Sequence, residues 1–163
     1  MIFWNTFIQS LQLPKKQIVF RLNRTGMDIT VIYMFLLLFI ASIPSLIDRI
    51  TTSTGPGSDM NLVFLIIYFF MFYYLPLTIA IFLIITLIAY IGSLVAKLLH
   101  RKLKLQVLWK MTAYTSTIPV LIYTVIAFYT PVNNYYILFV AIFITVMLSR
   151  IITIYPKRKK RKQ

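Results

Sequence analysis

The chain alternates between long apolar segments without any charged residue and shorter segments that carry all of its charges. The uncharged segments are residues 29–47, 60–96, 111–130 and 135–149. A helix needs roughly 20 apolar residues to cross about 30 Å of hydrocarbon, which matches the scale of these segments. Because 60% of the residues are hydrophobic, the chain has too little polar surface for a water-soluble globule. The pattern predicts an all-α membrane protein, a four-span transmembrane helical bundle.

This bundle is expected to occupy residues 28–155. Its predicted spans are about 29–47, 75–96, 111–129 and 135–155. The last span includes Arg150, which is close enough to the end of the helix to extend its charged group into the headgroup region.

The second apolar segment, residues 60–96, is too long for a single perpendicular crossing. As one straight helix it would measure about 55 Å at 1.5 Å per residue. Two crossings would place the basic 97–110 segment on the same side as the outer 48–59 loop, against the positive-inside rule. We therefore expect a crossing at 75–96 with residues 60–72 as an external or re-entrant extension. One long, tilted helix kinked at Pro76 is the alternative.

The N-terminal arm, residues 1–27, begins with an apolar helical pattern that is typical of an interfacial amphipathic helix. Its large apolar residues at helical spacing are Phe3, Trp4, Phe7, Ile8 and Leu11. The same pattern also fits a helix packed on the cytosolic ends of the spans. Four cations follow and are expected to bind lipid headgroups: Lys15, Lys16, Arg21 and Arg24.

Charge orients the predicted bundle. The net charge is +14, and of 17 Lys and Arg only Arg49 lies in the segment between the first two spans. Because basic residues are retained in the cytoplasm, both termini are expected there, in a bacterial cytoplasmic membrane. Residues 156–163 form a basic cytosolic tail that should contact anionic headgroups through Lys157, Arg158, Lys159 and Lys160. Lipid, rather than nucleic acid, is therefore the expected partner of these charges.

The residues that carry enzyme chemistry are scarce. The chain has no Cys, one His and three acids, Asp28, Asp48 and Asp59, which are dispersed in the sequence. His100 stands among cations, without the carboxylate that usually orients a general base. We expect no catalytic site, no metal site and no cofactor. A fold that brought Asp28 beside His100 would be the one route to an enzyme.

The most polar part of the predicted spans comes just before Pro119. It contains four hydroxyl residues: Thr112, Thr115, Ser116 and Thr117. Proline leaves the carbonyl of Thr115 without its helical donor, and neighbouring hydroxyls can compensate. Small hydroxyl residues favour a kinked helix contact, whereas a polar path for a solute or ion is the alternative.

Two stretches resemble a known family. They are SLQLPKKQIVFRLNRTG at residues 10–26, which leads into a first span containing IASIP, and WKMTAYTSTIP at residues 109–119. Together they resemble domain-of-unknown-function family 1189 of Gram-positive bacterial membrane proteins, related to the Yip-type membrane fold. Many of its members have a larger extracytoplasmic insertion where this chain has the short 48–59 loop. Some relatives are named as maltodextrin-utilisation proteins, so the resemblance implies a link to sugar uptake and supplies no catalytic residues.

Together these patterns predict a non-enzymatic, multi-pass accessory or organising subunit. Its expected partners are the anionic bilayer and either another membrane protein or further copies of the chain. The alternative is a small oligomeric channel or carrier for a small solute, in which the hydroxyl residues before Pro119 would line the passage.

Overall fold

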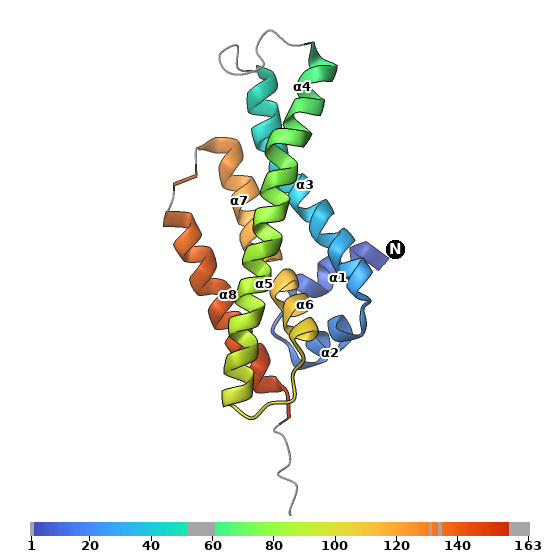
Figure 1. Ribbon diagram of the computed structural model, residues 1–163, viewed down its shortest axis with the longest axis vertical. Helices are drawn as coiled ribbons and strands as arrows, with labels where there is room; N and C mark the ends of the chain where they lie inside the picture. The colour runs from blue at the N-terminus through green and yellow to red at the C-terminus, as the bar shows by residue number, and fades with distance from the viewer. Residues whose placement is uncertain (1, 52–60, 131, 134, 157–163) are drawn as a thin grey trace, which may run out of the picture.

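The computed structural model describes residues 2–51, 61–130, 132–133 and 135–156, and this part of the chain is helical, without a strand. Its elements in chain order are α1 (Ile2–Leu11), α2 (Lys16–Arg24), α3 (Met27–Thr51), α4 (Leu62–Phe69), the π-helical turn η1 (Phe70–Tyr74), α5 (Leu75–Leu98), α6 (Leu105–Thr115), α7 (Thr117–Tyr129) and α8 (Tyr135–Ile154). Figure 1 shows the long helices running roughly along one axis, with α1 and α2 against one side.

Four helices are long and apolar enough to cross a membrane, and the predicted all-α architecture with four candidate spans is confirmed to that extent. They run over Met27–Thr51, Leu62–Leu98, Leu105–Tyr129 and Tyr135–Ile154. At 1.5 Å per residue, the 20 residues of the last helix measure about 30 Å, the thickness of a hydrocarbon core. Large apolar side chains cover the outside of these helices, as a lipid-facing surface requires.

The second of these helices is continuous from Leu62 to Leu98. Pro76 therefore lies inside a long helix, and not at its beginning. Pro76 has no N–H to donate to the carbonyl four residues earlier, and the π-helical turn directly before it changes the hydrogen-bond register, so that the Leu75 N–H reaches the Phe70 carbonyl. Continuity agrees with the single long helix kept as the alternative. The position of the bilayer along it stays a prediction.

The π-helical turn also fastens this helix to α3. The Tyr74 hydroxyl donates to the Phe35 carbonyl at 2.9 Å, and the hydroxyls of Tyr73 and Ser45 are 2.9 Å apart. Figure 1 shows α3 and α4 projecting together beyond the upper ends of α7 and α8.

The third candidate span is broken at Ser116. Helix α6 ends at Thr115 and α7 begins at Thr117, with the third residue of α7 being Pro119. Because the proline ring displaces the Thr115 carbonyl and offers no N–H, the chain cannot continue as one regular α-helix through this point. The Tyr136 hydroxyl of α8 donates to the Pro119 carbonyl and so ties the last helix to the break.

A residue with positive φ ends α5. His100 has φ 52°, its N–H donates to the Lys97 carbonyl, and the Arg101 N–H donates to the Ala96 carbonyl at 2.8 Å. These two hydrogen bonds form a Schellman motif, in which glycine usually occupies the left-handed position. The motif turns the chain back toward α6 and fixes the backbone position of Arg101.

The N-terminal arm packs on the bundle. Helix α1 contacts α6 and α7, whereas α2 contacts α6 and α8. The inner face of α2 buries Ile18, Val19 and Leu22. Three elements lie toward the bottom of Figure 1: α2, the Leu99–Lys104 turn and the C-terminal end of α8. We call this region the basic end of the bundle.

Candidate functional site

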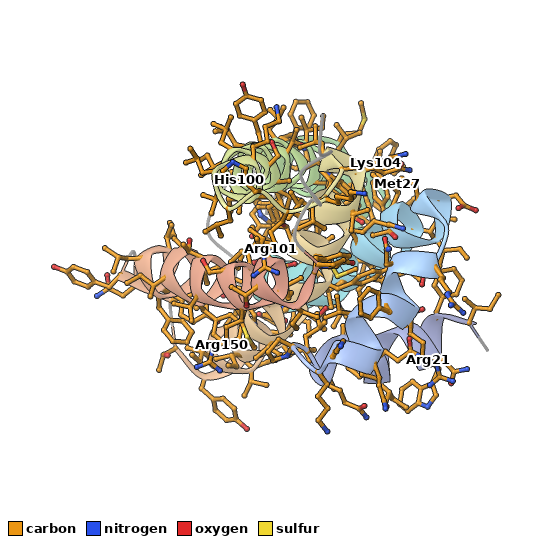
Figure 2. All side chains as sticks on the ribbon, turned by 90° about the horizontal axis from the view of Figure 1, so that it is seen from below. Arg21, Met27, His100, Arg101, Lys104 and Arg150 are labelled. Carbon is orange, nitrogen blue, oxygen red and sulfur yellow. The ribbon has the colours of Figure 1, made fainter. Side chains whose placement is uncertain are left out.

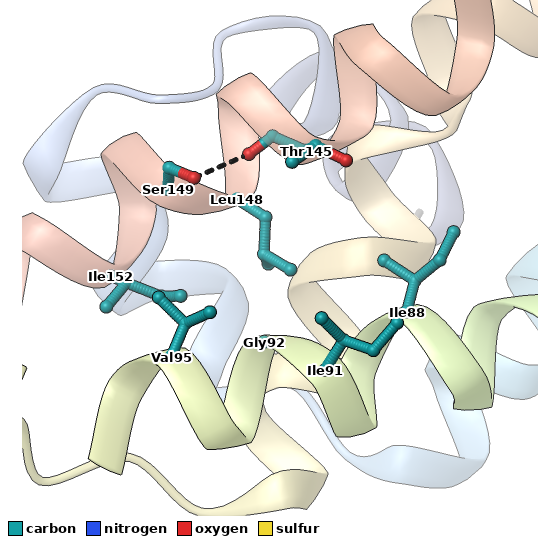
Figure 3. Close-up of a pocket in the computed structure, with 8 residues that line it drawn as sticks. All are labelled: Ile88, Ile91, Gly92, Val95, Thr145, Leu148, Ser149 and Ile152. Carbon is teal, nitrogen blue, oxygen red and sulfur yellow. Dashed lines mark hydrogen bonds between the residues drawn. The ribbon is translucent and has the colours of Figure 1, made fainter. Parts of the chain in front are cut away.

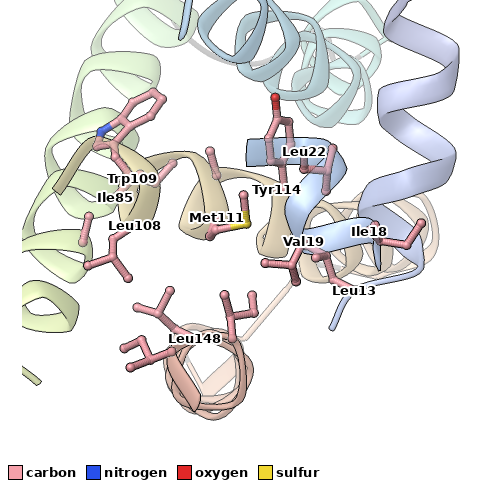
Figure 4. Close-up of a cluster of buried hydrophobic side chains, with 14 of the residues drawn as sticks. Leu13, Ile18, Val19, Leu22, Ile85, Leu108, Trp109, Met111, Tyr114 and Leu148 are labelled. Carbon is pink, nitrogen blue, oxygen red and sulfur yellow. The ribbon is translucent and has the colours of Figure 1, made fainter. Parts of the chain in front are cut away.

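The centre of the fold is α6, which is packed against most of the other helices. Every side chain from Leu108 to Thr117 is buried, and α6 is surrounded by α1, α2, α3, α5 and α8. Figure 4 shows Leu108, Met111 and Tyr114 of this helix among side chains of the other elements. The polar residues between Leu108 and Thr117 are therefore enclosed by protein.

A chain of hydroxyls joins α1, α3 and α7 at the helix break. The Tyr33 hydroxyl is 3.0 Å from Ser10 Oγ and 2.8 Å from Thr117 Oγ1. A second pair, Thr30 Oγ1 and the Tyr114 hydroxyl, is 2.7 Å apart and joins α3 to α6. In a nonpolar interior such bonds fix the relative positions of helices, because an unpaired hydroxyl there is costly.

The other hydroxyl residues predicted as a helix contact or polar path lie on the same short segment. Thr112 donates to the Leu108 carbonyl, and Ser116 donates to the Ala113 carbonyl at 2.7 Å. Thr115 is 1% exposed, and its Oγ1 has no hydrogen-bond partner. Ser116 also contacts Met34 Sδ of α3 at 3.8 Å, so in this conformation the segment is part of the packed interior between helices.

Lys110 is a buried residue that the sequence pattern places in the basic 97–110 segment. Its side chain is only 6% exposed, and its Nζ donates to the Asn23 carbonyl at 2.6 Å and to the Thr25 carbonyl at 2.9 Å. These carbonyls end α2, where a cation also interacts favourably with the helix dipole. The signal in the sequence is that Lys110 stands directly between the apolar residues Trp109 and Met111. In the structure both neighbours are buried, and Lys110 lies more than one turn inside α6.

The predicted headgroup cations of the arm lie on the exposed side of α2 and at its beginning. Lys15, Lys16, Arg21 and Arg24 are exposed, on the side of the arm opposite its buried face. Figure 2 places Arg21 at the rim of the basic end, with Arg150 and Lys104 at other points of this rim. The remaining predicted headgroup residues, Lys157, Arg158, Lys159 and Lys160, lie outside the described residues.

Helix α1 turns its small polar residues inward and its large apolar residues outward. Thr6 and Ser10 are buried, whereas Ile2 and Trp4 are 59% and 63% exposed. An exposed apolar face beside exposed cations is typical of a helix at a membrane interface. The interfacial position of α1 stays a prediction, and the packing of α2 agrees with the alternative of a helix held on the spans.

Arg101 joins the turn after α5 to the end of α8. Its Nη1 donates to the Tyr155 carbonyl, and the Tyr155 ring packs on Phe20 of α2 with the centroids 5.3 Å apart. The Nε of Arg101 and the hydroxyl of Tyr155 are buried without a partner. This contact closes the basic end around α2, α5 and α8.

Asp28 and His100, the pair considered for catalysis, do not come together in the structure. Asp28 and His100 are both exposed, no hydrogen bond or ion pair joins them in the described part of the chain, and Figure 2 shows Met27, next to Asp28, apart from His100. Within the described ranges no group of three His, Asp or Glu side chains could hold a metal ion.

The sequence model of the family described as "Protein of unknown function (DUF1189)" matches residues 56–151. The matched region contains the WKMTAYTSTIP stretch, and the arm and first span lie outside it. No curated protein and no solved structure matches the chain.

Proposed function

The chain belongs to this family of unknown function, and on that premise we propose that it is a non-enzymatic accessory or organising subunit of the bacterial cytoplasmic membrane. Both termini lie in the cytoplasm in this proposal. Among the described candidate spanning helices, the one buried cation is Lys110, and its ammonium group is bound to carbonyls of the arm.

One observation carries the proposal. The polar residues of α6 and α7 make contacts with the arm and with α3, through Lys110 to α2 and through Thr117 and Tyr33 to α1. Polar groups used in this way hold the arm in one position relative to the spans. A fixed, basic arm beside an apolar bundle suits a protein that positions a neighbour at the membrane surface.

Anionic lipid is the first partner that we infer. The exposed cations of the arm and the basic tail would lie at the cytoplasmic surface, where each adds about 1 kcal/mol of attraction to an anionic membrane. Replacing Lys15, Lys16, Arg21 and Arg24 with Gln should weaken retention of phosphatidylglycerol at low salt. Unchanged retention would contradict this part of the proposal.

A protein partner is tested by cross-linking in the native membrane at endogenous expression, followed by purification and identification of the attached proteins. The proposal predicts a reproducible membrane protein partner, which is lost when the arm is displaced by Lys110→Met and kept when exposed Lys104 is changed to Met. Recovery of copies of this chain alone would contradict the accessory role. The family match assigns no link to sugar uptake, so a maltodextrin transporter as the partner stays a hypothesis for this experiment.

Thr115 favours a second candidate function, an oligomeric channel or carrier for a small solute. Its Oγ1 is buried without a partner at a broken membrane helix, where transporters often place polar backbone and side-chain groups. The surrounding helices would have to separate before Thr115, Ser116 and Thr117 could line a passage. Solute flux into liposomes that Thr115→Val abolishes, with assembly intact, would support this candidate over the accessory role.

A further inference from the structure

A groove runs along the outside of α5 and α8 toward the basic end. The two helices approach closely at Gly92, where an added Cβ would stand 2.7 Å from Leu148 Cδ2. Beside this contact, a cavity of about 90 Å³ is lined by residues that include Ile88, Ile91, Thr145 and Ser149 (Figure 3).

The surface of this groove is apolar despite its two hydroxyl residues. Thr145 Oγ1 donates to the Ala141 carbonyl at 2.7 Å, and Ser149 Oγ donates to the Thr145 carbonyl at 2.8 Å. Both hydroxyl protons are thus used within α8. A hydrocarbon chain is chemically compatible with such a surface, because it requires no hydrogen-bond partner.

The end of the groove meets a cation. Val95 and Ile152 line its lower end, and one turn further the Arg101 guanidinium spans from the α5–α6 turn to the Tyr155 carbonyl. Of the three guanidinium nitrogens of Arg101, Nη1 makes a hydrogen bond to a described residue. The Arg101 side chain is partly exposed. Figure 2 shows Arg101 near the middle of the basic end.

No acidic residue of α5, α6 or α8 balances this charge. The chain has three acids, at positions 28, 48 and 59, and none of them belongs to these helices or to the turn between α5 and α6. The same turn adds Lys102 and Lys104. A phosphate group is the anion that guanidinium binds most readily at a membrane surface.

We propose that the α5–α8 groove and Arg101 form a binding site for one anionic phospholipid. An acyl chain lies along the groove, and the phosphate accepts hydrogen bonds from the terminal N–H groups of Arg101 that do not bind the Tyr155 carbonyl. This inference deepens the lipid part of the proposed function, because it names a second site, away from the arm, and a single lipid with a defined position.

The headgroup half of the site is tested by counting the phosphatidylglycerol molecules that remain on the purified protein, using native mass spectrometry. Arg101→Gln should weaken phosphatidylglycerol binding roughly tenfold, the loss expected for one charge-assisted contact. Lys102→Gln removes an equal charge from an exposed neighbour and should leave this binding unchanged. Equal effects of the two substitutions would overturn the site in favour of diffuse attraction.

The acyl half is tested with phosphatidylglycerol that carries a photoreactive diazirine in one acyl chain. Cross-links are expected on residues 88–95 and 145–152, and Ile91→Trp should remove most of them by filling the groove. The matched control is Leu87→Trp, because Leu87 is also exposed on α5 but does not line the cavity. Equal labelling of both Trp variants would overturn the groove as the lipid position.

Both tests are independent of the partner experiment. Each variant is first compared with the parent protein by gel filtration and thermal unfolding, and Ile91 is exposed, so its replacement leaves the core intact. Loss of lipid at Arg101→Gln with no protein partner found would keep the site and contradict the accessory role. A protein partner, found together with unchanged lipid binding by Arg101→Gln, would support the accessory role and contradict the lipid site.

Discussion

The Nζ of Lys110 lies 2.6 Å from the carbonyl oxygen of Asn23, so a lysine of the central helix closes the end of a helix in the N-terminal arm. The two residues are 87 positions apart in sequence. A second hydrogen bond, to the Thr25 carbonyl at 2.9 Å, holds the same ammonium group. These two hydrogen bonds link the arm to the bundle, and they compensate for the burial of the Lys110 ammonium group.

Replacing Lys110 with Met should loosen the arm. Met keeps much of the aliphatic volume but leaves the Asn23 and Thr25 carbonyls without their donor, at a cost of about 1–3 kcal/mol. We expect a lower thermal unfolding temperature in detergent and faster trypsin cleavage after Lys15, Lys16, Arg21 and Arg24. Lys104→Met, at an exposed position, is the control. Equal trypsin cleavage of the two variants would contradict the role given to Lys110.

Tyr33→Phe tests the hydroxyl chain at the helix break. It removes the contacts of Tyr33 with Ser10 and Thr117 and keeps the ring. Hydrogen bonds between membrane helices contribute about 0.6 kcal/mol on average and up to about 1.7, so the loss should fall in the range of roughly 1–3 kcal/mol. Tyr90→Phe, on the exposed surface of α5, should leave the unfolding free energy unchanged. The measurement is unfolding in mixed micelles with increasing denaturing detergent.

Thr115→Val should leave the stability unchanged or raise it by about 1 kcal/mol, because the valine removes a buried hydroxyl that has no partner. Thr117→Val, two residues further along, removes the bond to Tyr33 and should lower the stability. The same unfolding measurement compares the two variants. A marked loss for Thr115→Val would indicate that this hydroxyl binds something in the membrane.

His100→Gly should stabilise the protein. Glycine adopts the left-handed backbone at φ 52° without the steric cost that His100 bears, which corresponds to roughly 1 kcal/mol. His100→Val should destabilise it, because a β-branched residue tolerates this conformation poorly. Thermal unfolding of both variants distinguishes this backbone role from any role of the imidazole, for which the two substitutions would behave alike.

The number and approximate position of the spanning helices could be predicted from the sequence, because each depends on a local run of uncharged residues. The continuity of 62–98 could not, because the consequence of Pro76 depends on the π-helical turn that precedes it. A proline near the middle of a long apolar run is compatible with either a helix start or a locally re-registered helix.

The contacts of the candidate site were less accessible to sequence reasoning. Most faces of α5 and α8 are apolar, so their periodicity does not distinguish lipid-facing from buried positions. Lys110 was grouped with the basic loop, although its backbone lies inside α6 and its ammonium group reaches back to α2. The polar stretch from Thr112 to Thr117 marked the important region, but its partners Ser10, Tyr33 and Thr30 come from distant parts of the chain.

The most direct test of the account measures whether the arm is fixed to the bundle in a lipid bilayer. The chain has no Cys, so spin labels can be placed at exposed Gln12 and Tyr129 by substitution to Cys, and their distance distribution measured by double electron–electron resonance in nanodiscs. The account predicts one narrow distribution that broadens in Lys110→Met and is unchanged in Lys104→Met. A broad distribution in the parent protein would contradict the claim that the polar residues of α6 hold the arm in place.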